Sequence, residues 1–325
     1  MKKKAPTKPH KVFSSVLWIW IAICILAPFL PSTNAVHNLF GYPPPVLLCI
    51  PALLAILAVL ARFLTRRGNR LDIVNFVASL VSSFIIVGFQ IPLPLGSVTG
   101  QPVRVLTINA EKDNRTAPGL RDFILERKLD VVMMQEVKGG DKSPAAMLLR
   151  ELPDWHIATV GEVAILSRWP LTDVRSIPLR SLPGRFVLSA TVGSPQPFRA
   201  MTTHWSVPQI SRGLGSLSRT VKTQSYDYED TMEAVGKETL PVILGGDFNN
   251  PPRQGLSRMM SDRMEDAFSS RGFGPGWTYP AHRPLVRIDH LFSNKGIKPI
   301  HAEVGPSFGS DHRSIYAEFA LFAGS

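Results

Sequence analysis

The sequence predicts an α/β domain of about 225 residues that follows an apolar N-terminal region. About the first hundred of the 325 residues hold long apolar stretches, and from residue 103 the chain changes to short apolar runs separated by turns. Several of these runs alternate, or are apolar throughout, over five to seven residues, which is typical of strands. Charged residues make up only 19% of the chain and hydrophobic residues 45%, which excludes a largely disordered protein.

Three apolar stretches near the N-terminus are each close to the roughly 20 residues that a helix needs to cross a bilayer. The first contains no charge, Arg62 interrupts the second, and the third has Asp72 and Asn75 near its start. We therefore expect three transmembrane helices in a membrane anchor that covers residues 1–95. The three stretches are about 12–31, 46–64 and 71–91.

The net charge of +11 comes mostly from this N-terminal region. Residues 1–95 hold nine lysines and arginines but one acidic residue, and the basic residues lie before the first stretch and between the second and the third. Because basic loops stay in the cytoplasm, we expect a multi-pass protein of the plasma or inner membrane with residues 96–325 outside. Those residues hold 27 basic and 24 acidic side chains, and this balance does not indicate nucleic-acid binding.

Two other interpretations of the N-terminal region stay open. The first stretch, with its basic start, also fits a signal peptide that is cleaved near Thr33, Asn34 and Ala35. The stretch at 71–91 also fits a buried or interfacial helix, which would keep the rest of the chain in the cytoplasm.

The second domain, residues 96–325, follows a linker with prolines and a glycine at 91–96 and is expected to contain about eight strands. We expect helices at 120–128 and 229–238, and a mobile loop over 206–223, which is rich in Gly, Ser and Arg. The expected strands include 103–109, 130–136, 163–167, 199–204, 241–247, 287–292 and 314–319.

Polar residues stand at the ends of five of these strands, and a further pair precedes the last one. Side chains at strand ends gather at one edge of a sheet, so we expect these residues to converge. Carboxylates and amides are hard oxygen donors that suit Mg²⁺ or Mn²⁺, and neighbouring histidines suit proton transfer. Only two cysteines occur, both within the first 50 residues, which excludes a cysteine-rich metal site. The polar residues are Asn109, Glu136, His204, Asp247, Asn249, Asp289, Asp311 and His312.

Five short motifs around these residues occur in order along the second domain. They are Gln135-Glu136, Ala164-Ile165-Leu166-Ser167-Arg168-Trp169-Pro170, Gly245-Gly246-Asp247-Phe248-Asn249-Asn250, Arg287-Ile288-Asp289-His290 and Gly309-Ser310-Asp311-His312. Together they resemble the endonuclease/exonuclease/phosphatase family, the superfamily of DNase I-like nucleases, sphingomyelinases and inositol-polyphosphate phosphatases. The resemblance covers about residues 103–320, and the N-terminal segment is similar to that of the family's membrane-bound bacterial branch.

The resemblance implies a four-layer α/β sandwich and metal-dependent hydrolysis of a phosphoester. It implies that Glu136 binds the metal, Mg²⁺ or Mn²⁺, with Asn109 beside it. Asp311 matches a second carboxylate near the metal.

The resemblance also implies catalytic roles for five residues. Asp247 matches the aspartate that aligns or activates the attacking water, and Asn249 the amide that positions the phosphate. His312 matches the histidine that stabilises or protonates the phosphoryl centre, and Asp289 the acid that orients it. His204 lies where members place a residue that touches the scissile phosphate. These roles agree with the needs of phosphoryl transfer, which are charge neutralisation, an aligned nucleophile and help for the leaving group.

The expected substrate is a phosphate-containing molecule, either a lipid phosphate or diester close to the anchor or an extracellular nucleic acid. A lipid bilayer is the expected partner, and the sequence indicates no protein partner. The alternative function is that of a non-catalytic membrane protein that kept the fold as a binding module. Retention of all the matched polar positions favours the enzyme.

Overall fold

A computed structural model of the chain describes residues 8–30, 35–65, 67–94, 98, 100–111, 116–137, 140–209 and 214–322. The chain divides into two compact units, Met1–Phe89 with Arg253–Gly255 and Gln90–Pro252 with Leu256–Ser325. The boundary expected between residues 95 and 96 lies outside the described residues, and so do Thr33 and Asn34 of the alternative cleavage position.

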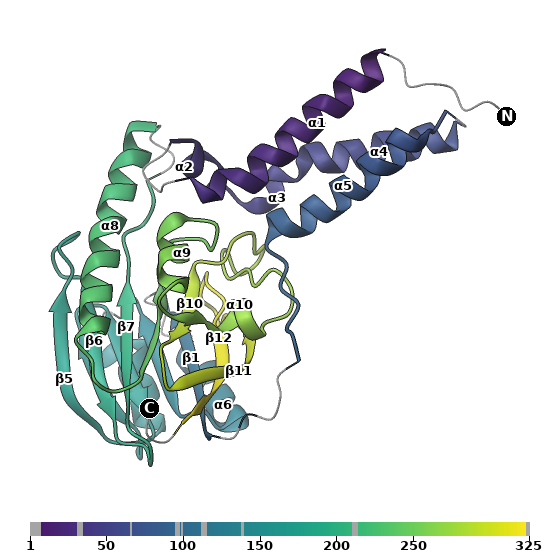
Figure 1. Cartoon of the computed structure of the whole chain (residues 1–325). Helices are drawn as coiled ribbons and strands as arrows, with labels where there is room; N and C mark the ends of the chain where they lie inside the picture. Colours follow the sequence, from purple (N-terminus) through teal and green to yellow (C-terminus); the bar gives the residue numbers. More distant parts are fainter. Residues whose placement is uncertain are drawn as a thin grey trace. The chain divides into compact units, whose positions relative to one another are not determined.

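The first unit is helical (Figure 1). By length and composition, two of its described helical segments can cross a membrane, His10–Phe29 and Arg70–Val87. The expected second span is divided, because a short helix ends at Leu48 and the 15-residue helix α4 begins at Ile50 with a proline in its first turn. Proline has no N–H to donate to the preceding turn. The helices are α1 (Lys8–Leu26), η1 (Ala27–Phe29), α2 (Ala35–Gly41), α3 (Pro45–Leu48), α4 (Ile50–Leu64) and α5 (Arg70–Val87).

A buried polar chain joins α1, α4 and α5. The Asp72 carboxylate, which is fully buried, accepts a hydrogen bond from Arg62 Nε at 2.8 Å and lies 3.1 Å from His10 Nε2. One turn further along α5, Asn75 Nδ2 donates to Ser14 Oγ at 2.8 Å. An unpaired polar group among apolar helices is costly, so these contacts hold the three helices in one register.

The second unit contains two six-stranded sheets (Figure 1). Their strand orders are β11-β12-β1-β2-β4-β3 and β5-β6-β7-β8-β10-β9. Strands β1 and β2 run parallel, and so do β7 and β8, while the other neighbouring pairs are antiparallel. The strands are β1 (Gln101–Asn109), β2 (Val131–Gln135), β3 (His156–Val160), β4 (Val163–Ser167), β5 (Leu171–Pro178), β6 (Phe186–Val192), β7 (Phe198–His204), β8 (Val242–Asp247), β9 (Glu265–Asp266), β10 (Asp289–Ser293), β11 (Ile297–Val304) and β12 (Ile315–Leu321).

Helices cover the outer face of each sheet, so the unit is a sandwich of helices, sheet, sheet and helices. One core lies between the sheets and includes Val105 of β1 and Ala200 of β7. A second core packs α6 and α7 on the first sheet, and a third packs α8 and α9 on the second. The helices are α6 (Thr116–Arg127), η2 (Gly140–Lys142), α7 (Pro144–Glu151), α8 (Leu214–Gly236), α9 (Gly255–Ser261) and α10 (Ala267–Arg271).

The seven strands named from the sequence all occur, as β1, β2, β4, β7, β8, β10 and β12. The sequence did not indicate β3, β5, β6, β9 and β11. Four of these are sheet edges, and β5 has mostly exposed side chains, so it carries no long apolar run.

The expected loop over 206–223 is wrong for its second half, because Leu214–Gly236 forms one helix, α8. Side-chain hydroxyls bond back to the preceding turn, with Thr220 Oγ1 donating to Ser216 O at 3.0 Å. The buried side chains of Val221 and Gln224 lie on the covered face of this helix. Packing of that face therefore overrides the weak helix propensity of Ser, Thr and Gly. Residues 210–213 lie outside the described part of the chain.

Candidate active site

The strand order brings the expected polar residues to one edge of the two sheets. In the first sheet the last residue of β1, Asn109, pairs with Gln135 at the end of the parallel strand β2. In the second sheet His204 at the end of β7 pairs with Asp247 at the end of β8, and Asp289 at the start of the antiparallel β10 pairs with Asp247. Parallel strands end at the same edge, and an antiparallel neighbour begins there.

Hydrogen bonds join the two sheets at this edge. Asn109 Nδ2 donates to Asp247 Oδ2 of the other sheet at 3.1 Å and to Glu136 Oε1 at 3.2 Å. Below it, Gln135 Nε2 donates to Thr107 Oγ1 at 3.1 Å and to Thr202 Oγ1 at 2.9 Å, which again connects the sheets. The site is therefore built on two layers whose spacing is fixed by buried polar contacts.

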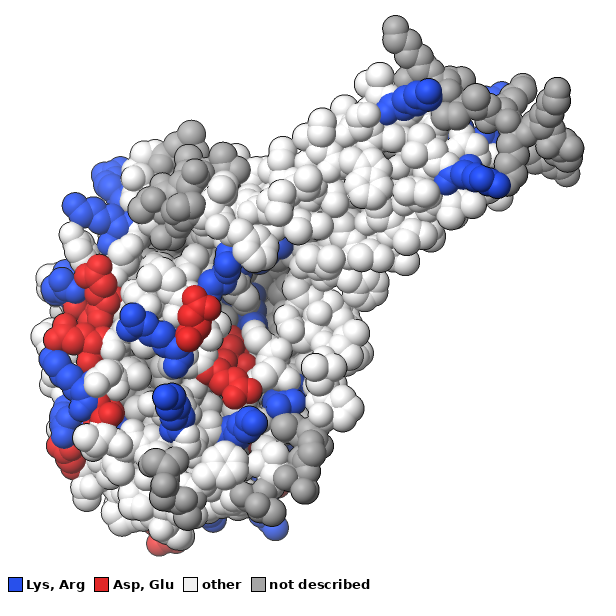
Figure 2. All heavy atoms as spheres, viewed as in Figure 1, with Lys and Arg blue, Asp and Glu red and all other residues white. Residues whose placement is uncertain are grey.

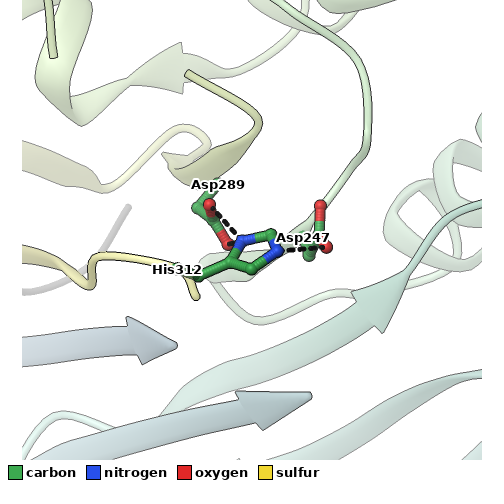
Figure 3. A group of neighbouring side chains, drawn as sticks. All are labelled: Asp247, Asp289 and His312. Carbon is green, nitrogen blue, oxygen red and sulfur yellow. Dashed lines mark hydrogen bonds and ion pairs between the residues drawn. The ribbon is translucent and has the colours of Figure 1, made fainter. Parts of the chain in front are cut away.

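His312 lies between two aspartates at the centre of the site (Figure 3). Its Nδ1 is 2.9 Å from Asp289 Oδ2, and its Nε2 is 3.8 Å from Asp247 Oδ2. All three side chains are buried. The turn before β12 fixes the histidine, because Ser310 Oγ donates to Asn109 O at 2.7 Å and accepts from His312 N at 3.0 Å.

The carboxylates around His312 favour the protonated form of its imidazole. Burial by itself lowers its pKa, but the neighbouring carboxylates of Asp289, Asp247 and Asp311 outweigh burial and raise the pKa to about 10. The three groups Asp247, Asp289 and His312 lie close enough to hold a metal ion between them, with ligand atoms within 4.8 Å of one another. We call Asp247, Asp289 and His312 the His312 row, and carboxylate and amide side chains that could also bind a cation lie beside it.

The carboxylates next to this row repel one another. Burial raises the pKa of Asp311; the His312 charge lowers it, and the carboxylates of Glu111, Glu136 and Asp247 raise it further. Asp311 Oδ1 lies 3.9 Å from His312 Nε2, and Asp311 N donates to Glu111 Oε2 at 3.0 Å. A divalent cation would relieve this repulsion, and carboxylate and amide oxygens are the donors that Mg²⁺ and Mn²⁺ prefer. The residues present therefore fit such an ion.

Three residues at this edge, among them Glu111 with φ +50°, have a backbone conformation that residues other than glycine rarely adopt. Glu136 has φ +57° and Asn249 has φ +48°. Asn249 is held there by two bonds, since its backbone N donates to Asp247 Oδ1 at 2.9 Å and its Nδ2 donates to Trp205 O at 3.1 Å. Asn tolerates this region, whereas Glu does so at a cost, and such conformations gather at functional sites.

His204 has a carboxylate partner that the sequence did not reveal. Its Nδ1 lies 2.8 Å from Glu162 Oε1, and its Nε2 lies 3.5 Å from Asp247 Oδ2. Glu162 stands in the turn between β3 and β4, where Val137 N donates to its backbone oxygen at 3.1 Å. Arg185 Nε lies 3.4 Å from the same Glu162 oxygen, and its Nη1 donates to His204 O at 2.9 Å. All eight residues expected from the sequence lie at this edge, and Glu162 and Glu111 join them.

The second unit is thus an α/β sandwich with a buried Asp–His pair and a cluster of carboxylates at one edge of its sheets. The family model described as "Endonuclease/Exonuclease/phosphatase family" matches residues 106–312. No protein with a curated description matches the chain.

Solved structures share the fold at low identity. One is an endonuclease/exonuclease/phosphatase from Bacteroides vulgatus, with 20% identity, a TM-score of 0.54, and 68% of this chain and 99% of that chain covered. A second is the 3'-5' exonuclease NExo from Neisseria meningitidis, with 21% identity, a TM-score of 0.55, and 67% and 100% covered. A third is TDP2 from D. rerio in complex with a single-strand DNA product, with 17% identity, a TM-score of 0.54, and 68% and 100% covered.

The chain belongs to the endonuclease/exonuclease/phosphatase family, because the family model matches well over half of its length. Members of this family are hydrolases that act on phosphoester bonds, and we assign the chain to that class of enzyme.

Proposed function

We propose that this chain is a membrane-anchored, divalent-metal-dependent phosphoesterase that hydrolyses a phosphomonoester or phosphodiester outside the cytoplasm. The observation that carries the proposal is the charged His312 between Asp289 and Asp247, with Asn109 and Glu136 in hydrogen-bond contact beside it. A buried cation next to a carboxylate that can align water suits attack on a phosphorus atom, where negative charge must be neutralised.

In this proposal Asp247, Asp289 and His312 act on the phosphoryl group of the substrate. Asp247 aligns the attacking water, and His312 stabilises the phosphoryl oxygens or protonates the leaving group. Asp289 keeps the imidazole oriented and charged, which its 2.9 Å contact with Nδ1 supports. Asn249 positions the phosphate from its fixed place beside Asp247, and His204 contacts it from the neighbouring strand, held by Glu162.

Glu136, Asn109 and Asp311 hold the metal in this proposal. When bound, Mg²⁺ or Mn²⁺ supplies charge neutralisation of the phosphate and of the surrounding acidic groups. The raised pKa of Asp311, caused by burial and by its acidic neighbours, supports a cation among these side chains.

The N-terminal region, residues 1–95, is the membrane anchor in this proposal, and residues 96–325 are the catalytic domain. Only 33% and 28% of the residues in the two span-length windows are buried, which is low for core helices of a water-soluble unit. On the face that Figure 2 shows, the described part of these helices carries few charged side chains, and the Lys and Arg side chains visible there lie at the end where α1 begins and α4 ends. The Arg62–Asp72 contact supports α4 as a third crossing helix, and three crossings from a cytoplasmic N-terminus put the catalytic domain outside.

A hydrolysis screen tests this function. The full chain in lipid nanodiscs would be offered duplex and single-stranded DNA, a sphingomyelin-like diester, a phosphoinositide and a polyprenyl pyrophosphate, each with Mg²⁺ and with EDTA. We expect release of phosphate or of an alcohol with Mg²⁺ only, and no release by the His312→Ala variant. Equal rates in EDTA would contradict the metal, and equal rates in the variant would contradict the site.

A further inference from the structure

The most exposed apolar side chains of the catalytic unit lie together. Among the large apolar residues that the structure describes in this unit, the three with the largest exposed fractions are Leu93 at 75%, Phe273 at 71% and Ile91 at 69%. The next, Val207, is 57% exposed and lies after β7. Large apolar groups that gather at one place on a surface mark a contact with another apolar phase.

Backbone hydrogen bonds fix this cluster. Gln90 N donates to Gly274 O at 2.8 Å, and Gly274 N donates to Gln90 O at 3.0 Å, so the two chain segments lie side by side. Arg271 Nη1 donates to Leu93 O at 3.1 Å and its Nε donates to Pro299 O at 3.1 Å. We call Ile91, Leu93 and Phe273 the Phe273 surface.

The covalent chain ties the Phe273 surface to the end of a proposed membrane helix. Helix α5 ends at Val87, and Gln90 follows three residues later. Three residues span at most about 11 Å, so Gln90 and its partner Gly274 stay that close to the end of α5. An 18-residue helix is about 27 Å long, close to the roughly 30 Å of a bilayer's hydrocarbon core. If α5 spans, its end lies at the lipid–water boundary.

The same loop continues from the Phe273 surface into the active site. Thr278 Oγ1 accepts a hydrogen bond from Asp289 N at 3.4 Å, and Thr278 O accepts one from Arg313 N at 2.8 Å. The ring of Tyr279, 37% exposed, lies with its centroid 4.8 Å from that of His312. This short loop therefore begins with the exposed Phe273 and ends with Tyr279, whose ring packs against His312 in the site.

We propose that the Phe273 surface docks on the lipid bilayer in which the chain is anchored, and that the substrate is a lipid phosphoester presented by that bilayer. The proposal rests on the proposed function, since it requires the anchor and the hydrolase. Aromatic and aliphatic side chains are favoured at the membrane boundary. A nucleic-acid surface would need cations that face phosphates, whereas Arg271, the cation bonded to this surface among the described residues, donates to two backbone carbonyls.

A depth measurement tests the docking. In the full chain with Cys24→Ala and Cys49→Ala, a fluorophore is attached at Phe273→Cys, or at Leu125→Cys on α6 as the matched control, since Leu125 is 54% exposed. In phosphatidylcholine vesicles we expect quenchers carried on lipid chains to reach the label at 273 and iodide to be excluded from it, with the reverse at 125. Equal access of iodide to both labels would overturn the docking.

An activity measurement tests the substrate class. Because each apolar side chain that leaves the lipid loses part of its transfer free energy, Leu93→Ser with Phe273→Ser should lower cleavage of a vesicle-borne lipid phosphoester about tenfold. Cleavage of the soluble bis(p-nitrophenyl) phosphate should not change, and Leu125→Ser should alter neither rate. Loss of DNA cleavage with unchanged lipid cleavage would overturn the lipid substrate. A wild-type chain that cleaves neither substrate contradicts the proposed function, and the depth measurement still decides the docking.

Discussion

Strand β10 carries two buried Asp–His contacts, and their surroundings differ. Asp289, its first residue, contacts His312, whose Nε2 faces Asp247 at 3.8 Å, a distance longer than a hydrogen bond. The next residue, His290, places its Nδ1 2.8 Å from Asp266 Oδ2 and its Nε2 3.2 Å from Asn250 O. His290 therefore has both ring nitrogens within hydrogen-bond distance of a partner, whereas Nε2 of His312 lies beyond that distance from Asp247.

Arg287 completes the second contact. Its Nη1 donates to Asp266 Oδ1 at 2.8 Å, so the aspartate is balanced by a permanent cation. Burial alone would raise the pKa of Asp266, but Arg287 and His290 outweigh it and hold that pKa well below its usual range. A network in which the polar groups are paired stabilises a fold, whereas Nε2 of His312 is 3.8 Å from Asp247 Oδ2 and faces the phosphoryl group in the proposed function. The two contacts have the same residue types and are both buried. They differ in whether Nε2 of the histidine has a partner within hydrogen-bond distance.

The largest expected effect is on catalysis at the His312 row. His312→Ala and Asp247→Asn should each lower turnover by about 10²–10⁴-fold, because each removes one oriented catalytic group. The double variant should be only slightly worse than the poorer single one, since groups that act together are not additive. Steady-state rates on any substrate cleaved by the parent check this, and unchanged melting temperatures serve as the control. Wild-type turnover by His312→Ala would show that the site is wrong.

At Glu136 we expect an effect of the same order, but through the metal. Glu136→Gln keeps the shape and removes the charge, so Mg²⁺ binding should weaken and turnover should fall by about 10²-fold. Calorimetric titration with Mg²⁺ separates this from a loss of the catalytic row, because His312→Ala should still bind the ion. Equal Mg²⁺ affinity in wild type and Glu136→Gln would contradict the assignment of this ligand.

The second Asp–His contact should respond in stability instead. Arg287→Ala leaves the buried Asp266 without its cation, and breaking a buried pair in this way typically costs about 3–5 kcal/mol of unfolding free energy. Turnover per folded molecule should stay near that of wild type at low temperature. Urea unfolding measures the first quantity and active-site-normalised rates the second. If Arg287→Ala lowered turnover as much as His312→Ala, this would contradict a purely structural role for the Asp266 contact.

Glu162 lies between these cases as a positioning residue. Glu162→Gln keeps the size of the side chain that contacts His204 but removes its charge, so we expect a loss of about tenfold, milder than the loss for a group that acts directly. A shift in the pH profile of turnover would distinguish this role from a purely structural one. The Glu162→Asp variant, which restores the charge, should recover part of the rate.

The sequence indicated which polar residues converge better than it indicated the strands of the two sheets. The eight site residues could be named because a polar residue after a buried apolar run is unusual, and β1, β2, β7, β8 and β10 supply such runs. Glu162 was not predicted from the sequence because it stands in a turn before β4, where an acidic residue is common. Its role depends on the pairing of β4 with β2, which is a long-range contact.

The sequence did not predict the edge strands and helix α8 for a related reason. The exposed strand β5 has little apolar pattern, and α8 begins in a Ser- and Gly-rich segment whose helical state depends on packing of its buried face. The three expected spans depended on hydropathy alone, which does not indicate that the second stretch is divided at Cys49, just before Pro51, into two helices. Local pattern therefore indicates which polar residues stand at strand ends more reliably than it indicates elements whose structure is decided by their neighbours.

The smallest expected effect is a difference in the pH dependence of stability between the two contacts. The folded pKa of Asp266 is lowered, so its ionised form contributes stability above the unfolded value of about 3.9 and this contribution is lost as pH falls below it. His312 has a raised pKa, so its contribution is complete below the unfolded value of about 6.5 and is lost as pH rises through about 10. The destabilisation caused by Asp266→Asn should therefore shrink on acidification, and that caused by His312→Gln should shrink on raising the pH. Urea unfolding in EDTA from pH 3 to pH 10 measures both, and parallel curves for the two variants would show that both contacts respond to pH in the same way.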